Sequence, residues 1–468
     1  MRNWMAVVVA QRHAVALGGA ITHRGEKLKR REERVNANTF ACKRFEVGLL
    51  GGCDVFQVAA HATITGSPYV AVRLREHQEG KPSGQAMGAM LACLRGWHPA
   101  LAAAELQALL PNAKLSTSNS PRWVQVASTT PAERSAALQL ASGLQCFLLS
   151  AVVHQTTSGD QADLMDSMQR YLQTHRVEGT VAVRAWKQGG KIPGWSLTEL
   201  TGRLGGILSE MGHTIDLEHP EHVLALVADG PHQALALGWM EGDGQAAFSN
   251  GERRAAERPY FKPVSLDPML ARLAINLATG PVTNGPLVDP MTGTGGFLIE
   301  ASLSGRPCIG IDIHSEMVHG AQANLAWAHN GKVPSTSQIV RGDATRLEDV
   351  LPKAWHGKVG GFVLDPPYGR NSHGSMDTMA LVEACLTSAQ RMAAQHAGFV
   401  LILPIHPPNP HPEQAISLDE PVALLHGGWR ELLAIVKRCG WHPESAHVER
   451  VHRSLSRLIL HARCVPQD

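Results

Sequence analysis

The chain has 468 residues, of which 44% are apolar and 18% charged, and this size and balance exclude a single small module or a largely disordered protein. It contains neither a run of about 18 apolar residues nor a secretory signal, so a cytoplasmic protein without a membrane span is expected. The 8 cysteines include no CxxC pair and the 24 histidines show no ligand spacing, which argues against a disulfide framework and a metal site.

The net charge of +2 is unevenly distributed along the chain. Residues 1–85 contain 13 basic and 7 acidic residues, whereas the rest of the chain contains 30 basic and 34 acidic residues. A mildly acidic body repels phosphate, so a nucleic acid partner would have to be held by a local group of basic side chains.

Residues 1–85 show no helical or strand periodicity, and we interpret them as a poorly patterned basic extension. The sequence that follows, up to about residue 245, has the periodicities of an α+β fold. Strands are predicted at 91–94, 123–126, 180–186, 222–227 and 234–239, and helices at 101–110, 132–149, 160–175 and 197–211.

Residues 246–285 are interpreted as a charged, proline-punctuated linker that includes a helix at 267–277. From residue 286 onward short apolar strands alternate with helices, which is typical of a parallel sheet with crossover helices. Strands are predicted at 287–289, 308–313, 338–340, 362–364 and 399–403, an extended segment at 451–462, and helices at 297–302, 315–329 and 378–394.

A glycine-rich turn at 289–297 joins the first of these strands to a helix. Glycines at 293 and 295 permit a tight turn and a close approach of backbone N–H groups to a ligand. The spacing is not GxGxxG and no Lys follows the glycines, so a dinucleotide or a phosphate-binding loop is disfavoured. The acidic residue before the turn suits the cationic sulfonium and amine of S-adenosylmethionine. We predict that Asp289, Thr292, Gly293 and Gly295 bind this cofactor.

Two further carboxylates follow the next two strands. Asp312 is placed to accept hydrogen bonds from both ribose hydroxyls, and Asp343 to accept one from the adenine amine. Ligands of open α/β sheets bind at the C-terminal ends of the strands. Each aspartate alone could be a helix cap, but the three carboxylates together with the turn favour a cofactor site.

The tetrad Asp365-Pro366-Pro367-Tyr368 follows the fourth strand and is the most specific motif. Two prolines remove backbone donors, so the Asp365 carboxylate and the Pro366 carbonyl would accept hydrogen bonds from a planar exocyclic amine. Tyr368 could stack on the ring of a flipped base. We predict Asp365, Pro366 and Tyr368 as catalytic residues. The alternative is a rigid turn with a buried tyrosine.

Together these motifs resemble the class I methyltransferases that modify exocyclic amines. The linker sequence from Arg253 to Pro263 and the stretch His452 to Arg457 are similar to those of the THUMP-domain tRNA guanosine N2-methyltransferases that act on guanosine 10. The resemblance extends from about Met90 to the C-terminus. It implies an α/β multidomain fold with a ferredoxin-like domain at 86–159, a THUMP RNA-binding domain at 160–245 and a Rossmann-like methyltransferase domain at 286–468.

The resemblance also implies tRNA as the partner and methylation of a guanine N2 amine as the activity. We expect Arg254, Arg258, Lys262 and Arg457 to bind the substrate. The first three lie in the linker, and their side chains could equally be solvated charges without a ligand. Trp195 could stack on RNA or pack in the core. Whether one or two methyl groups are added, and whether a small activating subunit is needed, stays open. The alternatives are guanine N2 or adenine N6 methylation of rRNA, snRNA or DNA, or a non-catalytic RNA-binding scaffold.

Overall fold

The computed structural model divides the chain into two compact units, Met1–Ala86 and Met87–Asp468. In the first unit it describes an antiparallel pair of short strands, β1 (Phe45–Glu46) and β2 (Gln57–Val58), and the rest of the predicted extension at 1–85 lies outside the described residues. In the second unit the described residues are 90–95, 98–156, 161–242, 253–262, 265–366, 377–412 and 414–465.

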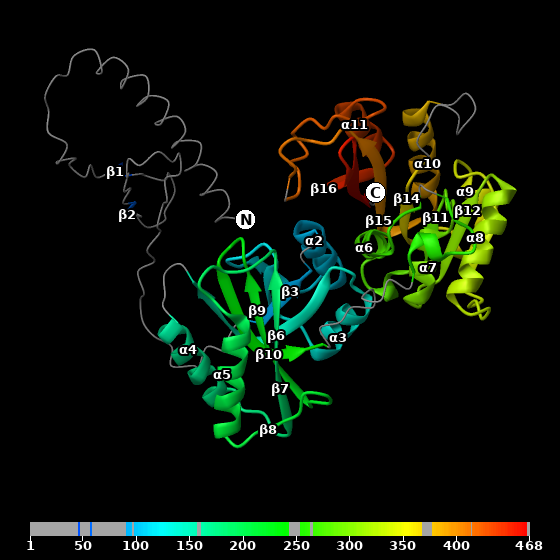
Figure 1. The fold of residues 1–468 in the computed structure, drawn as a ribbon. Helices are drawn as coiled ribbons and strands as arrows, with labels where there is room; N and C mark the ends of the chain where they lie inside the picture. The colour runs from blue at the N-terminus through cyan, green and yellow to red at the C-terminus, as the bar shows by residue number, and fades with distance from the viewer. Residues whose placement is uncertain are drawn as a thin grey trace, which may run out of the picture. The chain divides into compact units, whose positions relative to one another are not determined.

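The second unit begins with an eight-stranded sheet in the order β4-β5-β3-β6-β10-β9-β7-β8 (Figure 1). The sheet continues through both segments for which separate domains are predicted, because the long β6 pairs with β3 on one side and with β10 on the other. Its strands are β3 (Met90–Leu94), β4 (Lys114–Thr117), β5 (Trp123–Ala127), β6 (Leu144–Gln155), β7 (Thr180–Gln188), β8 (Thr214–Ile215), β9 (His222–Asp229) and β10 (Ala234–Glu241).

Four helices accompany this sheet, and local sequence explains their ends. Thr130 and Glu133 form a capping box at the start of α3, and Ser196 caps α5 through the N–H of Glu199. The helices are α2 (Pro99–Leu109), α3 (Pro131–Leu140), α4 (Gln161–Thr174) and α5 (Leu197–Glu210).

The predicted helix at 132–149 is wrong in its second half, where the chain forms β6. Gly143 interrupts the segment, and a Cβ atom at this position would lie 2.5 Å from the Cβ of Ala102 on α2. The buried apolar run after it suits a strand or a helix equally well when judged by periodicity alone. This run forms a strand because it pairs with β3 and β10, which lie elsewhere in the sequence.

The C-terminal part is a seven-stranded sheet in the order β13-β12-β11-β14-β15-β17-β16, in which the first five strands are parallel. This confirms the predicted Rossmann-like fold class. Its strands are β11 (Leu287–Asp289), β12 (Cys308–Asp312), β13 (Ser337–Arg341), β14 (Val359–Leu364), β15 (Ala393–Ile405), β16 (Trp441–His452) and β17 (Leu455–Cys464).

Helices cover both faces of this sheet (Figure 1). One apolar core contains residues of α6, α7 and α8, and the other contains residues of α9, α10 and α11. The helices are α6 (Pro268–Thr279), α7 (Gly296–Leu303), α8 (Ser315–Ala328), α9 (Leu347–Val350), α10 (Thr378–Met392) and α11 (Trp429–Arg438), with 3-10 turns η1 (Ala255–Glu257), η2 (Val282–Asn284) and η3 (Lys353–Trp355). Neither α11 nor most of β16 was predicted from the sequence. No helix in the described ranges is both long and apolar enough for a membrane span.

Helix α6, from the predicted linker, is buried along its whole length between α2 and the strands β14 and β15. Its Asn276 donates a 2.8 Å hydrogen bond to Glu105 of α2, and the same carboxylate accepts from the backbone N–H of Ser142 and Gly143. Burial raises the pKa of Glu105, while these hydrogen bonds act in the opposite direction. The helix therefore joins the two sheets through buried contacts.

Because the folded chain buries histidines, we predict that its free energy of unfolding decreases in mild acid. Burial, with a contribution from the charge of His98, lowers the pKa of His447 on β16 to about 3. The unfolded chain, with a histidine pKa near 6.5, therefore binds more protons than the folded chain between about pH 6.5 and 3. We expect His447 alone to lower the free energy of unfolding by about 2 kcal/mol between pH 7.5 and 5.

Urea unfolding at the two pH values tests this expectation. In His447→Leu the difference between the two pH values should shrink by about that amount, whereas His319→Gln, a substitution at an exposed histidine of α8, should leave the wild-type difference intact. An unchanged pH dependence in His447→Leu would contradict the assignment.

Candidate active site

Four aspartates occupy the C-terminal edge of the parallel strands. Asp289 ends β11, Asp312 ends β12, Asp343 lies two residues beyond β13, and Asp365 directly follows β14. These four strands are neighbours in the sheet and run in the same direction, so their C-terminal ends meet at one edge. The charges of Asp312 and Asp365 both act on Asp289, which places these three predicted residues together.

Asp289 is fully buried. Its Oδ1 accepts a 3.3 Å hydrogen bond from the N–H of Met291, and the Thr292 hydroxyl also acts on the carboxylate as a donor, although Oδ2 makes no hydrogen bond of ordinary geometry among the described residues. Burial raises the pKa of this carboxyl well above its ordinary range, and the charges of Asp312 and Asp365 raise it further. A cation bound here would relieve both effects.

The glycine-rich turn is fixed to the neighbouring strand. The N–H of Thr292 donates to the carbonyl of Ile311 at 2.8 Å, and Gly295, with φ of 80°, is the N-cap residue that precedes α7. Gly293 has φ of 51°, and a Cβ atom added to it would meet nothing within 4 Å, so this part of the turn borders open space. The Thr292 hydroxyl is buried and acts as a hydrogen-bond donor toward Asp289, which lowers the pKa of that carboxyl and opposes the effect of burial. The turn thus places polar groups beside an opening.

Hydrogen-bond donors from nearby residues orient Asp312 and Asp343. Asp312 accepts from Gly293 at 3.1 Å through Oδ2 and from His314 at 2.9 Å through Oδ1. Asp343 accepts from the N–H and hydroxyl of Thr345 through Oδ1 alone. Oδ1 of Asp343 is satisfied by these two donors, but Oδ2 of Asp343 and both oxygens of Asp312 keep lone pairs, so both side chains are held in place and can still accept hydrogen bonds from a nucleoside.

The predicted catalytic tetrad is described only in part. Asp365 is half-buried and Pro366 is buried at the end of β14. Pro367 and Tyr368 lie outside the described residues, so the catalytic role of Tyr368 stays a prediction.

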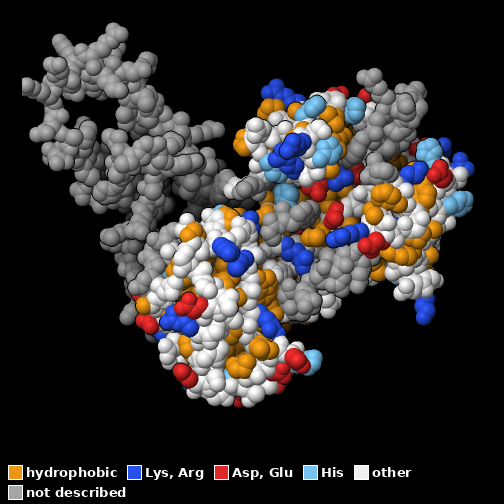
Figure 2. Space-filling model, viewed as in Figure 1, with side chains coloured by type: hydrophobic (Ala, Val, Ile, Leu, Met, Phe, Trp, Pro, Cys, Tyr) orange, Lys and Arg blue, Asp and Glu red, His pale blue; other side chains and the backbone are white. Residues whose placement is uncertain are grey.

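The four predicted substrate-binding side chains occupy different environments. Arg254 is exposed at the start of η1, whereas Arg258 is 4% exposed. Lys262 forms an ion pair with Glu316 at 3.2 Å, and Arg457 on β17 forms one with Glu449 at 3.1 Å. On the face in Figure 2, the described Lys and Arg side chains form several small groups among apolar and acidic ones, not one continuous basic surface.

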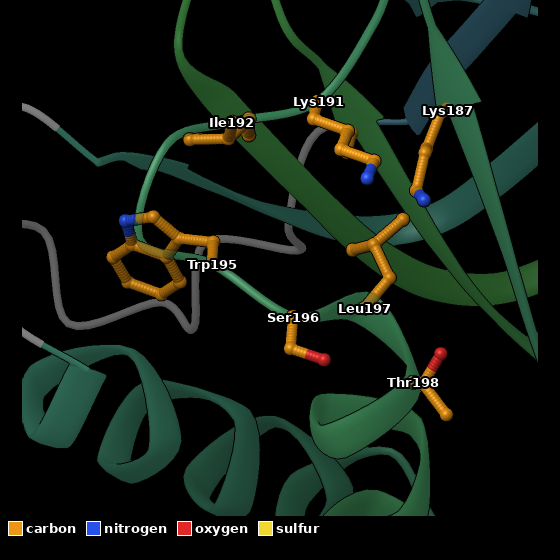
Figure 3. A pocket seen from close by; sticks show the side chains of 8 residues that line it. Lys187, Lys191, Ile192, Trp195, Ser196, Leu197 and Thr198 are labelled. Atoms are coloured by element: carbon orange, nitrogen blue, oxygen red, sulfur yellow. The ribbon is translucent and has the colours of Figure 1, made fainter.

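A cavity of about 340 Å³ between β7 and α5 was not predicted (Figure 3). Lys187, Lys191 and Trp195 line it together with Ser196, which caps α5, and the two lysine amino groups point into the same space. The lysines flank a Gly-Gly pair between strand and helix, and this spacing could have identified them. Positive charge beside an indole ring suits a nucleotide of an RNA strand. Within the described ranges, no group of three or more His, Cys, Asp or Glu is arranged to hold a metal ion.

Comparison with known proteins agrees with this geometry. Residues 255–419 match the family described as "RMKL-like, methyltransferase domain". The tRNA (guanine(10)-N2)-dimethyltransferase of Pyrococcus abyssi is 31% identical over 234 residues, which cover 49% of this chain and 66% of the relative. The enzyme of the same name from Methanothermobacter thermautotrophicus is 33% identical over 213 residues, which cover 44% of this chain and 57% of the relative.

The match therefore spans less than two thirds of either relative. Among solved structures, TrmN from Thermus thermophilus has 19% sequence identity and a TM-score of 0.43, with 80% of this chain and 99% of that chain covered. The sequence matches confirm the resemblance to the guanosine 10 methyltransferases that the motifs indicated. Residues 255–419 therefore form a methyltransferase domain of the RMKL-like family, and the chain is a sequence relative of the tRNA (guanine(10)-N2)-dimethyltransferases.

Proposed function

We propose that this chain transfers a methyl group from S-adenosylmethionine to the exocyclic N2 amine of guanosine 10 in tRNA. The observation that carries the chemistry is the placement of Asp289, Asp312 and Asp365 around the glycine-rich turn at one edge of the sheet. The substrate and its position come from the names of the two relatives.

The residues present suit the proposed cofactor. The buried Asp289 carboxylate would accept a hydrogen bond from the cofactor's ammonium group, and the negative potential of the three carboxylates favours a cation. Asp312 and Asp343 would accept from the ribose hydroxyls and the adenine amine. When bound, S-adenosylmethionine supplies an electrophilic methyl group next to its sulfonium. A phosphate-rich nucleotide would be repelled by the same carboxylates.

Asp365 and Pro366 would act on the other reactant. The lone pair of guanine N2 is delocalised into the ring, so this amine is a weak nucleophile and its orientation matters most. The Asp365 carboxylate and the Pro366 carbonyl would hold its two N–H groups. As the amine nitrogen gains positive charge, the Asp365 carboxylate stabilises that charge and can accept the departing proton.

Contacts far from the reacting amine would choose the tRNA, because a pocket for one flipped guanine cannot distinguish among many guanines. We propose that the predicted RNA-binding segment, which includes the lysine-lined cavity, anchors the tRNA, and that Arg254 and Lys262 contact its backbone near the active site. Hydrogen bonds from Asn276 of α6 to Glu105 of α2 and to the carbonyl of Leu140 at the end of α3 would keep the distance between anchor and active site fixed.

The lysine-lined cavity provides a test of anchoring. Replacing both Lys187 and Lys191 by alanine should weaken tRNA binding about tenfold at moderate salt, because two phosphate contacts are lost. The affinity for S-adenosylhomocysteine should not change. Filter binding with a full tRNA transcript measures the first quantity and calorimetry the second. The matched control replaces Lys332 and Lys437, two exposed lysines of the methyltransferase domain, and should bind tRNA as the wild type does.

The experiment that tests the function is methylation of a tRNA transcript by the purified full chain, followed by nucleoside mass spectrometry. We expect N2-methylated guanosine at position 10, which should disappear when guanosine 10 is replaced by adenosine. Formation of N6-methyladenosine instead would overturn the proposal. The same experiment counts the methyl groups added and reveals whether the chain acts without an activating subunit. A tRNA-modifying role would agree with the predicted cytoplasmic location, which stays a prediction.

A further inference from the structure

Arg258 lies inside the methyltransferase domain beside the glycine-rich turn. Its side chain is 4% exposed, and its Nη1 lies 3.4 Å from the position that a Cβ atom of Gly296 would occupy. Gly296 is the first residue of α7. The guanidinium therefore faces the start of a helix, where exposed backbone N–H groups create a positive potential. A cation in this position is destabilised unless an anion lies next to it.

Among the described residues no carboxylate hydrogen-bonds this guanidinium. Within the same part of the chain its side chain donates one hydrogen bond, from Nη2 to the carbonyl of Arg253 at 3.2 Å, and Nε and Nη1 have no partner. Burial lowers the pKa of Arg258, whereas the carboxylates of Glu300 and Asp267 raise it from beyond hydrogen-bond distance. A buried guanidinium with two unpartnered nitrogens is costly unless a ligand completes it.

The nearest carboxylates are already occupied. Glu300 is fully buried on α7 and pairs with Arg253 at 2.8 Å and with Arg272 at 3.0 Å. Asp267 caps α6 by accepting a hydrogen bond from the N–H of Met269 at 2.8 Å. Three guanidinium groups thus gather around one carboxylate, which leaves positive charge next to the helix start.

The segment that carries Arg258 is fastened to the same turn. Asn324 of α8 donates from Nδ2 to the carbonyls of both Tyr260 and Thr294, and its Oδ1 accepts from the N–H of Tyr260. Ser265 and Thr294 also share a hydrogen bond of 3.1 Å. These contacts fix the backbone that carries Arg258 to the glycine-rich turn.

We propose that Arg258 and the first N–H groups of α7 bind the carboxylate of the methionine moiety of S-adenosylmethionine. This inference rests on the proposed function. The amino acid end of the cofactor is a zwitterion, and the turn carries matching charges, with Asp289 available for the ammonium and Arg258 for the carboxylate. A guanidinium binds a carboxylate through two parallel hydrogen bonds. An RNA phosphate is disfavoured as the occupant because a polynucleotide backbone cannot enter a site that is 4% exposed.

The test pairs a change in the protein with a change in the ligand. Calorimetry of the full chain compares S-adenosylhomocysteine with its decarboxylated analogue, which keeps the amine and lacks only the carboxylate. Wild type should bind S-adenosylhomocysteine about 10- to 100-fold more tightly than the analogue, the range expected for a charge-assisted contact. Arg258→Met should lose this preference by binding S-adenosylhomocysteine more weakly and the analogue with nearly unchanged affinity.

Further variants separate binding from folding. Arg258→Lys keeps the charge without the paired donors and should show an intermediate preference. Arg391→Met removes an exposed arginine that pairs with Glu348 and should retain the wild-type preference.

Two results would overturn this inference alone. One is that Arg258→Met lowers the affinity for both ligands equally, and the other is that wild type binds both ligands with equal affinity. The second of these results needs no variant, so it decides even if Arg258→Met does not fold. Failure of wild type to bind either ligand would overturn the cofactor assignment and this inference with it.

Discussion

Replacing Asp365 by alanine should slow methyl transfer at least about 100-fold while the affinity for S-adenosylhomocysteine stays within about threefold of wild type. The reason is the timing of the interaction. The amine gains positive charge only as the methyl group arrives, so the carboxylate stabilises the transition state more than the bound reactants. Asp365 directly follows β14 and acts on Asp289 through its charge, so it lies beside the residues that we propose for the cofactor.

Single-turnover transfer to a tRNA transcript measures the rate, and calorimetry measures the affinity. Asp365→Asn keeps an oxygen acceptor of the same shape but loses the charge, so its rate should fall between those of wild type and Asp365→Ala. If cofactor binding fell as strongly as the rate, Asp365 would be part of the cofactor cradle and its catalytic role would be refuted.

Replacing Asp312 by alanine should have the opposite profile, with cofactor affinity reduced about 10- to 100-fold and a smaller change in the rate at saturating cofactor. A ribose contact persists from the bound state to the transition state, so its loss affects binding first. Asp312 also accepts from the N–H of Gly293 at 3.1 Å and from that of His314 at 2.9 Å. Its removal therefore loosens the turn as well as the ribose contact.

Calorimetry with S-adenosylhomocysteine and a cofactor titration of the transfer rate separate the two effects. Asp349→Ala offers a matched change at an aspartate that is half exposed in the same domain, where it pairs with Arg346. This control should bind the cofactor as the wild type does. A variant Asp312→Ala with normal affinity and a slow rate would contradict the assignment.

The full chain is the appropriate material for these experiments. Helix α6 contributes residues to the core of the Rossmann-like sheet, and Leu101 and Ala108 of α2 belong to the same core. Truncation near residue 245 would remove α2 and expose apolar surface of α6. A loss of activity in the truncated chain would then report on stability as well as on tRNA binding.

The sequence by itself was sufficient to predict that aspartates gather at the C-terminal edge of the parallel strands. Short apolar strands end in aspartates at 289 and 312, and parallel strands must bring their C-terminal ends to one edge. The glycines that allow the turn to form are also local features, since a positive φ is a property of a single residue. The structure agrees with these predictions because each depends on a few consecutive residues and one rule of topology.

Long-range contacts decided what the sequence left open. The segment after Gly143 is a strand only because β3 and β10 lie on either side of it. Arg254 and Arg258 come from one charged stretch and were expected to behave alike, yet the first is exposed and the second is 4% exposed. The guanidinium of Arg258 lies against Gly296 at the start of α7, and Asn324 of α8 fastens the neighbouring Tyr260 across the turn. Periodicity reveals local conformation, whereas the burial of a charge depends on which distant residues surround it.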